Sequence, residues 1–411
     1  MLLEINGAWY DCESFANTHP GGRHLLAVLD GKNATDLFRS MHRGPAAQAA
    51  LRRLPRHTRP SSQLSSRLAR SFHKLGADVE AAGLYTLHPR RYLARAAVLS
   101  VLLASAVACR IVNLSAILFA LFLQQIAFIG HDTGHNSVLA TRTANARLGL
   151  LVGNALSGVA ISWWKATHNM HHATTNSLDC DPDIQHAPAL VLSTAYLQRQ
   201  PVHSQYHKRA LVVSPFWRRV LRVQHWYFYP LMAVARFNLY AQSWCHVAAE
   251  RDACGAVALG VYHAALATWL CSWPTVAAAV QWLFVSHALA GVLHVQIAVS
   301  HFFMEFYSGV PSGEAFVRTQ LATTTDITCP SWLDWWHGGL QFQVAHHLFP
   351  RVPRDNLRAL TAMVRGFCKQ EGLPYHSVSW WAANRALLRG LKVAGQHGDG
   401  SVVYEACQAE G

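Results

Sequence analysis

Three short stretches place histidines on neighbouring turns of what would be a helix. They are "HDTGH", "HNMHH" and "QVAHH", and they hold His131, His135, His168, His171, His172, Gln343, His346 and His347. On a helix, positions i, i+3 and i+4 share one face, so each stretch would project its polar side chains together. Imidazole-rich sites with few carboxylates suit iron, copper or zinc. Seven histidines exceed what one tetrahedral zinc uses, which favours a two-metal site.

Two further sets of residues would complete such a site. His301, in "SHFFMEF", follows a long apolar segment and offers one more imidazole. A neutral imidazole binds metal through one ring nitrogen and needs the other nitrogen held by an acceptor. Asp132, Asp181 and Asp183 are nearby carboxylates that we expect to orient the ligands in this way.

The elements that position these residues belong to an unusually apolar chain. Of its 411 residues, 51% are hydrophobic and only 14% are charged, which is typical of a membrane protein. The net charge of +13 comes without a compact Lys/Arg run with interleaved aromatics. It therefore favours a basic face at a membrane surface over a nucleic-acid partner. The nine cysteines are scattered singly, which indicates neither a disulfide framework nor a zinc ribbon.

Four apolar segments approach the roughly 20 helical residues that cross a bilayer. They pair as residues 93–112 with 113–130 and residues 255–272 with 274–300. We therefore expect two helical hairpins, and we interpret residues 148–164 and 226–240, which are interrupted by Gly, Asn, Pro or Arg, as interfacial. Because an even number of spans separates the second histidine stretch from the third, all three can meet on one side of the membrane.

Arginines indicate which side that is. The segment before the first span carries many of them, from Arg52 to Arg91, whereas the turns inside the hairpins offer little beyond Arg110. The positive-inside rule then puts both termini and the histidine stretches in the cytosol. The N-terminus "MLLEINGAWYDCESF" has no basic region followed by a long apolar run, so we expect no secretory signal.

Composition divides the chain into four parts. Residues 1–45 are predicted to form a small soluble module, 46–92 a basic linker, 93–385 the membrane domain and 386–411 a weakly structured tail. The first part contains "THPGGRHLL" and "ATDLFRSMHRG", a pair of segments that resembles the haem-binding module of cytochrome b5. The usual leading strand and helix are not seen before "WYD", so we expect a shortened module.

The order of the motifs along the chain resembles the front-end membrane fatty-acyl and sphingolipid desaturases. After the haem module come HDxxH, HxxHH and a third box, "GGLQFQVAHHLFPRVPR", in which Gln replaces the first His. The strings "WWKATHNMHH", "DPDIQH" and "RFNLY" are similar to the same group, and the resemblance extends from Ala8 to about Trp381.

The resemblance implies cofactors and ligands residue by residue. It implies a di-iron centre that uses dioxygen as co-substrate, with the ligand positions His131, His135, His168, His171, His172, His301, Gln343, His346 and His347. It also implies haem b with His19 and His42 as axial ligands, and two imidazoles on one haem suit electron transfer rather than oxygen binding. The expected fold is an all-α integral membrane domain with a cytosolic helical cap, joined to a small α+β cytochrome b5-like module.

The same resemblance implies partners, location and substrate. An NAD(P)H-cytochrome b5 reductase would supply electrons, and the endoplasmic reticulum membrane would hold the protein. A lipid chain would enter an apolar tunnel, with its headgroup near Lys165, Arg351, Arg354 or Arg358. The expected product is a fatty acyl chain with a new double bond toward its carboxyl end, as in polyunsaturated fatty acid biosynthesis.

Several alternatives stay open from the sequence. "DITCPSWLDWWHGGLQFQ" is also close to sphingolipid long-chain-base desaturases, and a cytochrome b5-fused lipid hydroxylase needs the same iron and oxygen. From a different class, a membrane metal transporter would line a path with histidines, although the spans hold few acids for such a path. A membrane-anchored haem carrier would leave everything after residue 130 without a role.

Overall fold

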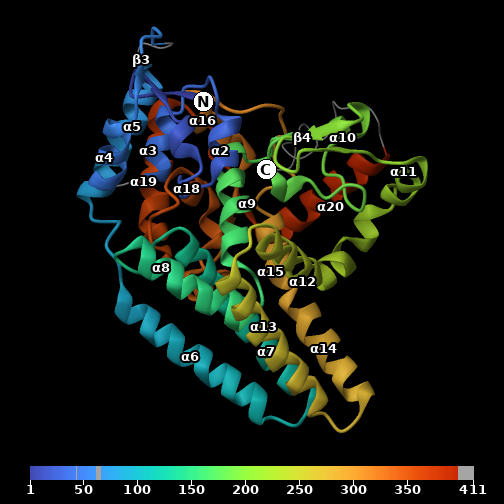
Figure 1. The fold of residues 1–411 in the computed structure, drawn as a ribbon. Coiled ribbons are helices and arrows are strands. Elements are labelled where there is room, and N and C mark those ends of the chain that lie inside the picture. The colour runs from blue at the N-terminus through green and yellow to red at the C-terminus, as the bar shows by residue number, and fades with distance from the viewer. Residues whose placement is uncertain (43, 62–65, 397–411) are drawn as a thin grey trace.

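The computed structural model describes residues 1–42, 44–61 and 66–396. Long helices extend toward one end of the molecule, and the remaining elements gather at the other end, where the N-terminus also lies (Figure 1). The chain is mostly helical, and the described strands form a three-stranded sheet, β1-β2-β3, and two small two-stranded sheets.

Four helical segments are long and apolar enough to cross a membrane, as predicted. They are α6 (Pro89–Ala108), α7 (Val112–Gly134), α13 (Ala253–Cys271) and the run formed by α14 (Val276–Ala290) and α15 (Val292–Ala298). Apolar side chains such as Leu93, Val257 and Val276 are largely exposed on them, because none of the described residues covers those faces. Exposed apolar helix faces of this length suit hydrocarbon rather than water.

The N-terminal module is an α+β unit. Its elements are β1 (Leu2–Ile5), β2 (Ala8–Asp11), α1 (Glu13–Ala16), α2 (Arg23–Val28), α3 (Thr35–Met41), α4 (Pro45–Arg53), β3 (Arg56–His57) and α5 (Arg67–Ala81). Strand β3 pairs with β2, so the module's sheet takes in residues beyond 45, the boundary expected from composition. Much of the segment expected as a linker is likewise packed helix, because Leu68, Phe72 and Leu75 of α5 are buried.

The module is docked on the rest of the chain through a shared core. The hydroxyl of Ser40 in α3 donates to the carbonyl of Leu348, 2.8 Å away, and the ring of Phe72 lies 5.4 Å from that of Phe349. On the other edge the amide of Asn33 donates to the hydroxyl of Ser312. One continuous apolar cluster therefore joins the module to the segment after the last membrane helix.

The remaining elements form the cap that holds the histidines. Between the spans lie α8 (Arg142–Gly149), the π-helix η1 (Leu150–Ala155), α9 (Ile161–Thr174), α10 (Thr194–Gln198), β4 (Val202–Ser204), β5 (Arg209–Leu211), α11 (Pro215–Leu221) and α12 (Gln224–Ala249). After the spans come α16 (Ala315–Thr323), β6 (Asp326–Thr328), α17 (Asp334–His337), α18 (Gln343–Leu348), α19 (Leu357–Glu371), β7 (Ser377–Ser379) and α20 (Trp380–Gln396). The short 3-10 turn η2 (Pro182–Ile184) lies between α9 and α10, and η3 (Ser331–Leu333), η4 (Leu340–Phe342) and η5 (Arg354–Asn356) follow the spans.

Helix α20 changes the expectation for the C-terminal tail. It continues past residue 385 and buries Leu387, Leu391 and Ala394 in the cap. The first part of the predicted tail is therefore packed helix, because its apolar residues recur at helical spacing and find a partner in α12. The rest of that tail, residues 397–411, lies outside the described residues.

Candidate metal centre

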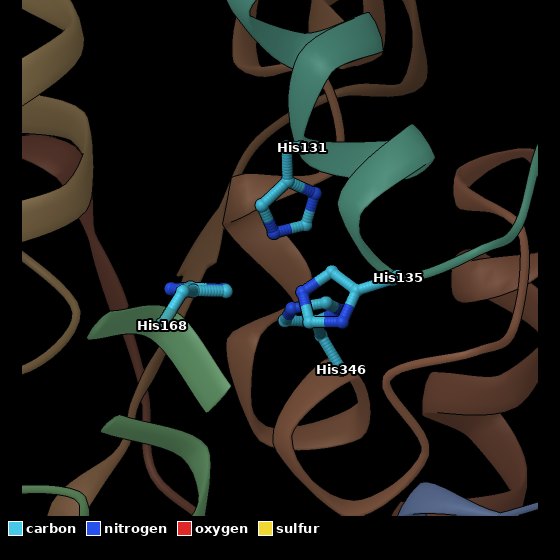
Figure 2. A group of neighbouring side chains, drawn as sticks. All are labelled: His131, His135, His168 and His346. Atoms are coloured by element: carbon cyan, nitrogen blue, oxygen red, sulfur yellow. The ribbon is translucent and has the colours of Figure 1, made fainter. Parts of the chain in front are cut away.

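Four histidines from three separate elements converge at the C-terminal end of α7. His131 and His135 come from the end of α7, His168 from α9 and His346 from α18, and their rings point toward one another (Figure 2). One ring nitrogen from each lies within 4.8 Å of one from every other, so the four could hold a metal ion. The first, second and third histidine stretches thus meet, as their spacing predicted.

A second group forms beside the first. His171, His301 and His347 each offer a ring nitrogen within 4.8 Å of the other two. His172 lies between the groups: its Nε2 is 3.1 Å from Nε2 of His168, and its ring stacks on that of His347 with centroids 4.3 Å apart. Helix α9 therefore serves both groups, because its residues 168 and 171 face different partners.

Several of the candidate ligands have a buried polar atom that lacks a partner within the described residues. Nε2 of His131, Nε2 of His135, Nδ1 of His172 and Nε2 of His346 make no hydrogen bond to the described residues, and neither does Oε1 of Gln343. Leaving buried polar atoms unpaired costs about 1–3 kcal/mol each, so a cluster of them indicates a missing partner. Nitrogen atoms and an amide oxygen converging in this way fit metal ions.

The second group is held by hydrogen bonds to the ring nitrogens that face away from its centre. Nδ1 of His171 lies 2.9 Å from Oδ2 of Asp181, and Nδ1 of His347 lies 2.9 Å from Oε1 of Gln320. Nδ1 of His301 lies 3.2 Å from the carbonyl of Thr323. These contacts occupy each Nδ1 of the group and leave each Nε2 available as a metal ligand.

The predicted orienting carboxylates differ in what they do. Asp181 is fully buried and also accepts the amides of Asn176 and Asp183, so the loop after α9 is built around it. Oδ2 of Asp183 stays 3.8 Å or more from the nearest histidine nitrogens. Asp132 lies 3.5 Å from Nδ1 of His131, at the limit of a hydrogen bond.

Burial sets the protonation of most of these imidazoles. It holds the pKa values of His135, His168, His172, His301, His346 and His347 well below the ordinary value, and the neighbouring histidines lower them further. They are therefore neutral and able to bind metal at pH 7. His171 differs: burial lowers its pKa, but the charge and hydrogen bond of Asp181 raise the pKa to about 9.

The third histidine stretch is positioned by residues at its N-terminal side. Oδ1 of Asp326 in β6 accepts a hydrogen bond from the amide of Val344, the second residue of α18, and Tyr375 donates to the same carboxylate. Burial raises the pKa of Asp326 to about 6. The preceding turn needs glycine, since Gly338 has φ +60° and a Cβ there would lie 2.2 Å from the ring of Phe128.

A polar network ties α7 to the chain after the third stretch. The carboxylate of Asp132 accepts a hydrogen bond from Tyr92 of α6, 2.6 Å away, and another from Arg354. Arg358 is likewise paired, with Asp334. These two arginines were expected near a lipid headgroup, and the structure instead gives both a carboxylate partner within the chain.

The two histidines of the N-terminal module face each other across a cavity. Their ring centroids are 6.1 Å apart, and Nδ1 of His42 lies 3.0 Å from the carbonyl of Phe38. Nδ1 of His19 lies 3.5 Å from the carbonyl of Gly22. Two metal–nitrogen bonds of about 2.0 Å, with half a ring on each side, come close to this separation. Burial lowers the pKa of His19, and that of His42 to about 4, so both are neutral and fit the axial positions of a haem.

Sequence reasoning missed the residues that act on the ligands from distant segments. Gln320 accepts from His347 and donates to the carbonyl of His172, so one buried amide links the second and third stretches. Tyr92, Asp326 and Tyr375 were missed too. Each is an isolated polar residue far from the histidines in sequence, and no spacing connects it to them.

A haem-binding module docked on membrane helices that carry a histidine-rich metal centre defines a class of membrane redox proteins. The family model for fatty acid desaturases matches residues 108–379, and that for cytochrome b5-like haem/steroid-binding domains matches residues 1–77. The chain belongs to the fatty acid desaturase family, in the group of front-end desaturases fused to cytochrome b5. It is therefore an oxidoreductase with a di-iron centre and a haem.

Relatives that align with most of this chain support this assignment. The chain is 36% identical to Delta(8)-fatty-acid desaturase 2 of Arabidopsis thaliana over 96% of this chain and 90% of that protein. It is 33% identical to the acyl-lipid (9-3)-desaturase of Borago officinalis over 95% of this chain and 89% of that one. It is also 36% identical to a Delta 8-(E)-sphingolipid desaturase of Kluyveromyces lactis, over 80% of this chain and 60% of that protein.

Proposed function

We propose that this protein introduces a double bond into a fatty acyl chain, between an existing double bond and the carboxyl end. The observation that carries the proposal is the convergence of the two histidine groups, with their unpaired buried nitrogens, beside a docked haem module. The names of the Arabidopsis and Borago relatives support a fatty acyl substrate. A sphingoid base is the second candidate, because a sphingolipid desaturase is as similar in sequence over the part that aligns.

We assign the iron ligands by group. One iron is held by His131, His135, His168 and His346, and the other by His171, His301 and His347. His172 and Gln343 complete the set, since each has a buried atom without a partner among the described residues. His19 and His42 hold the haem iron through Nε2.

The side chains around the histidine ligands fix the orientation of their rings. Iron supplies the oxidising power that removes hydrogens from an unactivated methylene with dioxygen and two electrons, which no side chain can provide. Asp181 keeps the Nδ1 proton of His171 in place and thereby fixes which ring nitrogen faces inward. Gln320 does the same for His347 through its amide oxygen, and its own amide group donates to the backbone of His172. The burial of all these groups excludes water from the reaction.

We propose that the spans form two hairpins, α6 with α7 and α13 with α14–α15, in the endoplasmic reticulum membrane. The cap, the module and both termini then face the cytosol. The excess of arginine before α6 supports this orientation. A cytosolic haem module would be reached by NAD(P)H-cytochrome b5 reductase, the proposed electron source.

Lipid analysis of an expressing host tests the function. A host lacking polyunsaturated lipids would express the chain and be fed candidate fatty acids, and double bonds would then be located by mass spectrometry in fatty acids and sphingoid bases. A new double bond on the carboxyl side of an acyl chain supports the proposal, and one in the sphingoid base moves it to the second candidate. A hydroxylated product would instead indicate a lipid hydroxylase.

The control variant removes one histidine of the second metal group and the histidine that lies between the two groups. His171→Ala combined with His172→Ala should abolish the product while the protein still reaches the membrane and keeps its haem spectrum. Product formation that survives this double substitution would contradict the assigned site. A metal transporter would be favoured if the expressing host took up more zinc and the purified protein contained no iron.

A further inference from the structure

The cavity that holds His19 and His42 is closed partly by the membrane domain. Its volume is about 740 Å³, and apolar side chains of the module, including Leu25, Leu29 and Leu37, line its interior. The facing wall comes from the segment after α7 and from α9. The haem cavity is therefore composite, and the module alone does not supply all of its lining.

Cations dominate the membrane-domain side of this cavity. Arg142 at the start of α8, Lys165 in α9 and Arg351 after α18 all line it, and no Asp or Glu does so among the described residues. His19 and His42 line the same cavity as these three cations. The cations therefore lie near both imidazoles.

Lys165 is the cation of this group that has no anionic partner among the described residues. Burial lowers the pKa of Lys165, and the positive charges of Arg142 and Arg351 lower it further, without a contribution from any carboxylate. Lys165 is half-buried, yet it makes no hydrogen bond or ion pair that would offset this repulsion within the part of the chain that the structure describes. Such an arrangement is costly unless an anion binds there.

Haem has the matching chemistry. Its macrocycle is apolar, but two propionate carboxylates project from one edge. The apolar interior of the cavity suits the macrocycle and would strongly disfavour the carboxylates. The propionates would therefore be held at the polar side of the cavity, where Arg142, Lys165 and Arg351 lie.

We propose that Arg142, Lys165 and Arg351 bind the haem propionates and clamp that edge of the haem against the membrane domain. His135 lines the same cavity and belongs to the first histidine group. The clamp would thus hold the haem edge beside a residue of the metal centre. The inference rests on the haem-binding module and needs no particular lipid substrate.

Haem retention and reduction potential of the full-length, haem-loaded protein test the clamp. Arg142→Gln, Lys165→Gln and their combination would be compared with Arg147→Gln, which removes an exposed arginine of the same helix that does not line the cavity. Transfer of haem to excess apomyoglobin gives the release rate, and spectroelectrochemical titration of the Soret band gives the potential.

We expect haem release to accelerate about tenfold for each cation removed, as for the loss of one charge-assisted hydrogen bond. The potential should fall, because nearby cations favour the reduced haem, which carries one positive charge fewer. Lys165→Arg, which keeps the charge, should stay close to the unsubstituted protein, and Arg147→Gln should change neither quantity.

Equal release rates and potentials in Arg142→Gln/Lys165→Gln and Arg147→Gln would overturn the clamp. If the double variant kept both values but bound phospholipid vesicles more weakly, the cations would serve a lipid phosphate, and the clamp would again be wrong. Because both readouts come from the haem, they are independent of whether the protein desaturates an acyl chain or a sphingoid base.

Discussion

Asp181→Asn should release one iron while the other stays bound. The carboxylate of Asp181 is fully buried and lies 2.9 Å from Nδ1 of His171, which offers its other nitrogen to the group with His301 and His347. The amide that replaces the carboxylate has one acceptor oxygen instead of two. Its NH2 group would therefore face either the ring N–H of His171 or a backbone N–H of the loop after α9, so that two donors meet. Loss of such an orienting contact typically costs about 10–100-fold in metal affinity, or about 1.4–2.7 kcal/mol.

A chelator challenge measures this effect directly. Iron per protein would be followed by elemental analysis as the chelator concentration rises, with Asp183→Asn as the matched control. Oδ2 of Asp183 lies 3.9 Å from the same Nδ1 and its side chain is 32% exposed, so its loss should change iron affinity less than about fivefold. Asp181→Asn that loses iron no more readily than Asp183→Asn would refute the reasoning.

Further predictions concern packing, the third box and the haem. Gly134→Ala places a Cβ 2.0 Å from the ring of Trp164, which stacks on His168 at 4.2 Å; we expect loss of iron and a lower Tm, at a cost of about 1–3 kcal/mol, and an unchanged iron content would contradict this. Gln343→Ala should weaken iron binding in the same chelator challenge, while Gln343→His should retain it; equal affinity in all forms would show that Gln343 is no ligand. Burial lowers the pKa of His42 to about 4, so the Soret spectrum should persist well below pH 6.5. Because the unfolded chain takes up this proton near pH 6.5, the haem-free fold should lose Tm as pH falls from about 6.5 to about 4, and a flat profile would argue against a buried neutral His42.

Hydropathy predicted the spans well because it reports a property of each segment by itself. The four apolar helices occur where expected, with ends shifted by a few residues. The same reasoning failed for residues 46–92 and for the tail, where composition indicated a linker and a loose end. Helices α5 and α20 are amphipathic, and they are ordered because α19 and α12 cover their apolar faces. These partner helices are distant in sequence, so composition could not reveal that they pack on α5 and α20.

The site was predictable to the extent that ligands recur at helical spacing. The three stretches could be read as convergent faces, and His301 could be added from its position after the last span. How the ligands divide was not predictable, because it depends on how α9 is rotated between α7 and α18. Lys165 and Arg351 show the same limit: their charge suggested a lipid headgroup site, whereas both residues line the cavity that contains His19 and His42.

The length of α7 is what connects the membrane to the chemistry. Its apolar part lies in the span, while its last turn carries His131, and His135 follows directly at its end. Each residue of an α-helix adds about 1.5 Å of rise and 100° of rotation, so one extra residue within α7 would turn His131 away from His346 even if the helix stayed equally apolar. The close approach of Gly134 to Trp164 permits little adjustment of that last turn. The geometry of the metal centre is thus set by the register of a membrane helix, whereas its depth in the membrane is set by hydropathy.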